Sequence, residues 1–148
     1  MLAPVRTVAP TADLVSLSDA KSQCRLDASD DDARLTAMIQ AATAHLDGYS
    51  GVLGRALVTQ TWQQDFSGFC DKMRLPVGDL IEVMEVTYYD ASNAAQTLSS
   101  SVFTSFTDAL GPYLTLEPNQ SWPAVYSRPD AVRVTWTAGY GATADAVP

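Results

Sequence analysis

The chain has 148 residues, of which 47% are hydrophobic and 18% are charged, a composition typical of one globular domain and not of a disordered segment. Seventeen acids against nine bases give a net charge of −8, which argues against tight nucleic-acid binding and against docking on an anionic membrane. No stretch approaches the roughly 20 apolar residues of a membrane span, and the N-terminus lacks the apolar core of a signal peptide.

Residues 1–15 contain proline and alanine and show no period, so we expect an extended arm that is mobile unless a partner holds it. A first helix is predicted over about 19–25. Ser16 or Ser18 is its expected N-cap, and Asp19 lies in its first turn, where a negative charge suits the helix dipole.

The second helix is the clearest element and is predicted over about 31–49. Apolar residues recur at three- and four-residue spacing, which predicts a core-facing side. That side carries Leu35, Ile39, Ala42 and Leu46. We expect Ser29 or Asp30 to cap the helix and the following glycines to end it. The two helices form a helical part over residues 16–54.

Residues 55–141 are rich in β-branched and aromatic residues and predict a β part. Its expected strands lie near 57–66, 73–75, 81–89, 96–98, 102–106, 113–116 and 131–138, with turns at 90–93 and 108–111 and a proline-containing loop over 117–130. In the first strand Val58, Trp62 and Phe66 share one face, and in the last Val132, Val134 and Trp136 do.

The fold class is therefore α+β, with N-terminal helices followed by an antiparallel β-sandwich or a small barrel-like β region. Residues 142–148 form a C-terminal tail with no apolar period of its own.

The sequence predicts no catalytic residue, no cofactor site and no metal site. His45 is the single histidine, it lies within the second helix, and no nucleophile-elbow motif accompanies it. Residues 27–32 resemble the start of a calcium loop but lack the required glycine and distant glutamate, so we interpret them as a helix start. Gly139-Tyr140-Gly141 is interpreted as a turn, because no phosphate-binding pattern follows it.

Cys24 and Cys70 form no C-x-x-C motif, and we interpret both as reduced, partly buried side chains. A disulfide between them stays open at this point, since it depends on geometry. Folding in the cytoplasm is the default expectation.

The order of several segments resembles the head-tail connector (adaptor) proteins of long-tailed phages, prophages and gene transfer agents. The resemblance runs over about residues 15–141. Its most specific parts are R-A-L-V-T-Q-T-W at 55–62 and A-G-Y-G at 138–141. Two departures stand out: a small insertion at 52–54, and an end at Pro148, where relatives continue into a further helix. The second departure suggests a C-terminally shortened form.

The resemblance implies a structural virion protein in the neck of a phage or gene-transfer-agent particle, folded in the cytoplasm of the bacterial host. It implies a ring, commonly dodecameric when bound to the portal, that connects the portal to stopper or tail-completion proteins. DNA would pass through the ring without specific binding, and no membrane is involved. The ring order, the kind of particle and the surface that meets each partner stay open.

Two aromatic residues, Trp122 and Tyr126, lie in the proline-containing loop, where they are either pinned beneath the loop or presented to a partner. The candidate interface residues are Trp122, Tyr126, Tyr140, Val147 and Pro148. The alternative function is a carbohydrate- or peptide-binding β module with a helical appendage, which the aromatic content and the same loop favour.

Overall fold

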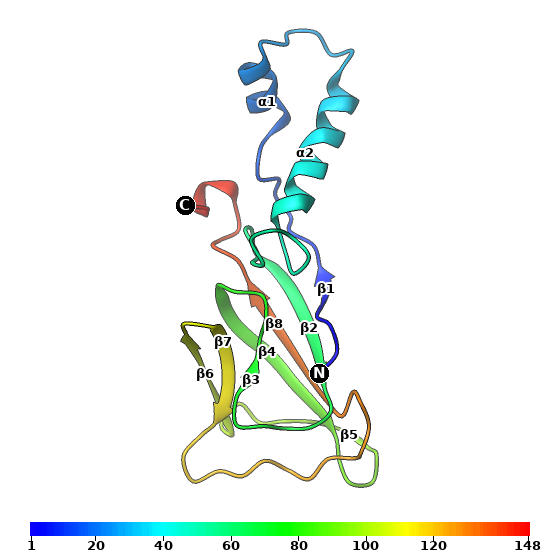
Figure 1. Ribbon diagram of the computed structural model, residues 1–148, viewed down its shortest axis with the longest axis vertical. Coiled ribbons are helices and arrows are strands. Elements are labelled where there is room, and N and C mark those ends of the chain that lie inside the picture. The colour runs from blue at the N-terminus through cyan, green and yellow to red at the C-terminus, as the bar shows by residue number, and fades with distance from the viewer.

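A computed structural model describes all 148 residues and confirms the α+β class. Figure 1 shows two helices that form a hairpin, which projects beyond one end of a pair of β-sheets. The elements in chain order are β1 (Val5–Val8), α1 (Leu17–Cys24), α2 (Asp32–Leu46), β2 (Gln60–Phe66), β3 (Met73–Arg74), β4 (Leu80–Tyr89), β5 (Ala95–Thr97), β6 (Phe103–Asp108), β7 (Gly111–Leu116), β8 (Val132–Ala138) and a short 3₁₀ helix, η1 (Ala144–Ala146).

The strands form two separate antiparallel sheets. The larger has the order β1-β2-β8-β4-β5 and the smaller the order β3-β7-β6. The core lies between them, so the β part is sandwich-like and does not close into a barrel.

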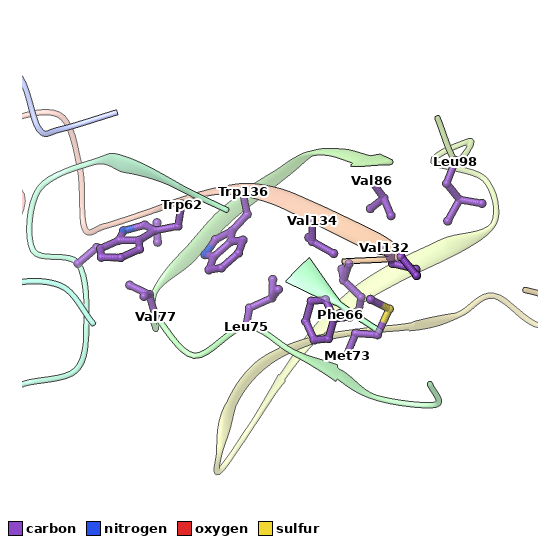
Figure 2. Packing of buried hydrophobic residues seen from close by; sticks show 14 residues of the cluster. Trp62, Phe66, Met73, Leu75, Val77, Val86, Leu98, Val132, Val134 and Trp136 are labelled. Atoms are coloured by element: carbon purple, nitrogen blue, oxygen red, sulfur yellow. The ribbon is translucent and has the colours of Figure 1, made fainter. Parts of the chain in front are cut away.

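Buried and outward-facing residues alternate strictly along β2 and β8, as the period of their apolar residues predicts, and the buried ones form much of this core. Alternate residues of each strand are buried, and the others face outward. Figure 2 shows side chains of β8 pointing toward residues of the segment that includes β3, with Trp136 near Leu75. Trp136 is fully buried, and Leu75 is 2% exposed.

Part of the predicted mobile arm is instead a strand. β1 pairs antiparallel with β2, and the Leu2 N–H donates to the Asp65 carbonyl at 2.9 Å. The amide of Gln64 donates to the Leu2 carbonyl at 3.1 Å. The expectation that a partner must hold the arm is therefore wrong for residues 2–8, because the chain itself holds them.

Both helices are confirmed, with shorter bounds for α2 than predicted. Ser16 caps α1, and its hydroxyl accepts from the Asp19 N–H at 3.0 Å. The predicted caps of α2 are wrong, since Asp31 occupies the N-cap position without a side-chain hydrogen bond. Asp32, next along the chain, instead forms an ion pair with Lys21 of α1 at 2.6 Å, which joins the two helices.

The predicted core face of α2 is wrong. Neither helix contains a buried residue. Leu35 and Ile39 are half-buried, whereas Ala42 and Leu46 are exposed. The hairpin projects away from the sheets, so α2 has only α1 and the chain ends to cover it (Figure 1).

Cys24 and Cys70 are free, as interpreted, but both are exposed and not partly buried. Cys24 lies in the last turn of α1, and Cys70 lies in the segment between β2 and β3.

β4 is irregular at two points. Its pairing with β8 shifts between Leu80 and Glu82 and again between Val83 and Glu85, so Ile81 and Met84 are the extra residues of two bulges. Both side chains are more than half exposed.

An ion pair between Arg74 and Asp108 joins two strands of the smaller sheet. Arg74 of β3 donates to both carboxylate oxygens of Asp108, at 2.5 and 2.7 Å. Asp108 also accepts from the Leu110 N–H in the predicted turn, which Gly111 closes at a φ of 108°. The hydrogen bond from Arg74 holds the pKa of the Asp108 carboxyl well below its usual range.

Ile39→Ala should lower the free energy of unfolding by less than about 1 kcal/mol, because the side chain is half-buried. Leu75→Ala, in the core, should cost about 2–5 kcal/mol. Urea unfolding of both variants measures the difference. Equal losses would show that the face of α2 belongs to the folding core after all.

The Asp108 pair should stabilise the fold above about pH 4, the ordinary range of an aspartate pKa. Because the folded-state pKa is lowered, this contribution is lost progressively as the pH falls below that value. Thermal unfolding of the natural chain and of Asp108→Asn should therefore differ at pH 7 and converge toward pH 2. A difference that does not change with pH would contradict the assignment.

Candidate partner interface

A buried carboxylate joins the helical hairpin to the sheets. Asp47 follows α2, and its side chain is 4% exposed. Its oxygens accept from the Leu57 N–H at 2.8 Å and from the Gln60 amide at 2.9 and 3.1 Å. Arg6 of β1 approaches the same carboxylate at 3.3 Å. The Asp47 carboxylate therefore connects the C-terminal end of α2 to β1 and to the start of β2.

The two most specific segments of the sequence pack against each other beside this carboxylate. The Tyr140 N–H donates to the Leu57 carbonyl at 3.0 Å, and the Thr59 N–H donates to the Gly141 carbonyl at 2.9 Å. Gly139 has a φ of 135°, and a Cβ there would lie 2.7 Å from the Val58 backbone. Only glycine fits this turn, which directs the tail toward the hairpin.

An apolar groove of about 420 Å³ opens at the base of the hairpin. Its walls come from one face of α2, from the residues before α1, from the segment that follows α2 and from the tail (Figure 1). The lining residues are Leu14, Val15, Ile39, Ala42, Thr43, Leu46, Leu53, Leu57, Val147 and Pro148. Thr43 supplies the one polar side chain among them. Such an open apolar surface is typical of a site that another protein covers.

The groove explains two sequence predictions together. Three residues of the apolar period of α2, interpreted as a core face, line the groove instead: Ile39, Ala42 and Leu46. Val147 and Pro148 line it as well. Sequence reasoning missed Leu14, Val15 and Leu53, which lie outside any periodic segment. Their only signal in the sequence is a pair of apolar residues next to a polar residue or glycine.

The other candidate residues lie apart from the groove lining. The Tyr140 hydroxyl accepts from Arg55 at 2.6 Å, beside the glycine turn. Trp122 stacks on Phe69, with ring centroids 4.6 Å apart and planes 3° from parallel. Tyr126 is 44% exposed. Figure 1 shows the loop that holds Trp122 and Tyr126 at the end of the molecule opposite the hairpin. The candidates therefore divide between two ends.

Most basic residues are already neutralised inside the chain. Seven of the nine form ion pairs with aspartates, and only Arg25 and Arg34, near the tip of the hairpin, have none. Those pairs involve six of the seventeen acids, which leaves eleven carboxylates without an ion pair. The surface potential is therefore negative and repels phosphate backbones.

No group of three or more histidine, cysteine, aspartate or glutamate side chains is placed to hold a metal ion. His45 is exposed near the end of α2. None of the helices has the length and apolar character needed to cross a membrane.

The comparisons with known proteins agree with this surface-based description. A family model described as Phage gp6-like head-tail connector protein matches residues 14–113. No curated protein matches the chain.

Solved structures share the fold over nearly the whole chain. A chain in the neck of an empty GTA particle computed with C6 symmetry has a TM-score of 0.77 at 19% identity, covering 99% of this chain and 76% of that one. A chain in the virion of a native GTA particle has a TM-score of 0.74 at 18% identity, with the same coverage. A chain in the neck of a native GTA particle computed with C12 symmetry has a TM-score of 0.66 at 19% identity, covering 99% and 75%.

Asp47→Ala should lower the free energy of unfolding by about 2–4 kcal/mol, because it leaves the Leu57 N–H and the Gln60 amide buried without an acceptor. Asp130→Ala, which breaks the more exposed pair with Arg128, should cost much less, because water screens an exposed ion pair. Urea unfolding compares the two. Hydrogen exchange in the Asp47 variant should also speed up in β1. Unchanged protection there would contradict a joining role for Asp47.

Proposed function

Because this chain belongs to the phage gp6-like head-tail connector family, we propose that it forms a ring in the particle neck, between the portal and the stopper or tail-completion proteins. DNA passes through the ring without specific binding. The observation that carries the proposal is the apolar groove on a helical hairpin that buries no residue of its own.

The chain is a structural neck protein and not an enzyme, as the family and the matched neck structures indicate. The resemblance drawn from the sequence is thus confirmed at the level of the family.

Ring assembly is supported by the symmetry of the matched necks, which were computed with C6 and C12 symmetry. A ring of identical copies needs a head-to-tail contact, in which two different patches of each subunit meet. The groove supplies one surface suited to such a contact or to the portal, and it includes Val147 and Pro148.

The candidate interface residues lie toward two opposite ends of the molecule, as expected for a protein that contacts a different partner at each end. The groove lies at the base of the hairpin, and the Tyr140 N–H donates to the carbonyl of Leu57, one of the groove residues. The loop over 117–130, which contains Tyr126, lies at the opposite end of the molecule (Figure 1). One end would meet the portal and the other the stopper or tail-completion protein.

The acidic surface supports passage of DNA through the ring. The carboxylates without an ion pair repel the phosphate backbone, so a duplex slides past such a wall without sticking.

The alternative of a carbohydrate- or peptide-binding module rests on exposed aromatic rings. Phe69 covers one face of Trp122, whereas Tyr126 is 44% exposed. The family match favours the connector function.

Ala42→Asp should prevent ring assembly on the portal, because it places a charge in the groove. Ala41→Asp is the matched control, since Ala41 is an exposed neighbour on the same helix outside the groove. Mass measurement in solution, with and without portal, reads out assembly. We expect the natural chain to be monomeric alone at micromolar concentration and ring-forming with portal, and the Ala42 variant to lose at least 10-fold in ring yield.

Assembly of the Ala42 variant at the same level as the Ala41 control would show that the groove is not an assembly surface. A natural chain that forms no ring with portal or in particles would overturn the proposed function.

A further inference from the structure

We propose that neighbouring copies join edge to edge through their larger sheets, with β1 of one copy pairing with residues 80–85 of β4 in the next. This inference rests on the ring assembly proposed above and names the contact that builds the ring. Each subunit would use one edge of its sheet to receive a neighbour and the other to reach the next.

The first half of β4 is an open edge. β5 pairs only with Thr87–Tyr89, so no strand covers residues 80–85 on the side away from β8. Ile81 and Met84 extend from this part, 51% and 57% exposed. An edge with free N–H and C=O groups and large apolar side chains is a template for another strand.

β1 is the open edge at the other side of the same sheet. All four of its residues are exposed, and β2 is its only partner strand. Val5 and Val8 are 59% and 54% exposed. Soluble proteins normally protect such edges with charge, proline or a covering segment, whereas both edges here combine charged residues with large exposed apolar side chains.

The strand directions make the two edges compatible. Neighbours in the order β1-β2-β8-β4 are all antiparallel, so β1 and β4 run in opposite directions. A second sheet that continues the first in the same orientation therefore brings its β1 antiparallel to β4. The two surfaces differ, so the contact is head-to-tail, which is the kind that closes rings.

The charges on the two edges are opposite. Glu82 and Glu85 lie in the open part of β4, and neither forms an ion pair within the chain. Arg6 of β1 is 43% exposed and uses only Nη1 toward Asp47 and Gln60, which leaves its other N–H groups available. Opposite charges across paired strands stabilise the pair.

The dimensions suit a ring with an open centre. Four strands at a spacing of about 4.8 Å make each copy about 19 Å wide. Twelve copies, as in the C12 neck, would give a circumference of about 230 Å and a radius of about 37 Å with the strands along the axis, and any tilt enlarges it. The bulges at Ile81 and Met84 bend β4 where the sheet must turn toward the next copy.

Cysteine cross-linking in assembled particles tests the pairing. Cys24 and Cys70 are first replaced by serine, because both are exposed and free. Two double variants, Val5→Cys with Met84→Cys and Val8→Cys with Ile81→Cys, sample one antiparallel register. On mild oxidation we expect at least one of them to give a ladder of covalent multimers up to the closed ring in a non-reducing gel.

Val5→Cys alone is the first control, because a head-to-tail contact leaves identical positions apart. Val5→Cys with Gln96→Cys is the second, since Gln96 lies on β5, beyond the open part of β4. Rings that form but give no ladder with either pair, or an equal ladder in a control, overturn edge pairing and leave the connector function intact. Absence of rings in the natural chain overturns both proposals.

A charge test keeps the proposal falsifiable if a cysteine pair disturbs folding. Ile81→Lys with Met84→Lys should lower ring yield at least 10-fold, whereas Leu110→Lys should not, because Leu110 is 82% exposed at the tip of the smaller sheet. Equal ring yield in the two variants would overturn the edge contact.

Discussion

The arrangement of the whole molecule depends on one buried carboxylate. A carboxylate removed from water is costly unless donors surround it, and the donors to Asp47 come from β1, from the start of β2 and from the backbone before it. The helical hairpin contributes no buried residue to the core. The attachment of the hairpin to the sheets therefore depends more on this polar junction than on apolar packing. Because hydrogen-bond donors have fixed directions, the network also defines the angle between the hairpin and the sheets.

This junction divides the molecule into parts with different energetic roles. The sandwich holds the buried apolar residues and supplies the folding stability. The hairpin, the groove and the open sheet edges keep apolar area in water, which becomes favourable only when another protein covers it. A partner that binds the folded form alone also stabilises that form, so the hairpin should become more rigid on assembly.

The sequence predicted those elements whose burial follows from a local pattern. β2 and β8 alternate strictly because one face meets the core. β1 was missed because its residues are held by distant groups, the strand β2 and the Asp47 carboxylate, which no local period reveals. The face of α2 was assigned to the core because an amphipathic period shows that a helix will be covered, and not whether its own chain or a partner covers it. Val147 and Pro148, predicted from the sequence as partner-interface residues, line the groove, and their contact with a partner stays a prediction. The packing of Trp122 on Phe69 could be seen only in the structure.

Open apolar edges would be a hazard in a free subunit, because a head-to-tail contact that fails to close produces filaments. The internal ion pairs influence how strongly free subunits repel one another, and so how readily they form filaments. They use seven of the nine bases and six of the seventeen acids, so the charges left without an ion pair are eleven carboxylates and two arginines. Like charges repel free copies over roughly a Debye length, about 8 Å at physiological salt, whereas strand pairing acts only at contact. In the proposed assembly, a portal that gathers copies at fixed positions would supply the closeness that free copies lack, and it would fix the curvature at which the ring closes. Under that proposal, the acidity that would let DNA slide through the ring would also keep free subunits apart until their binding site is present.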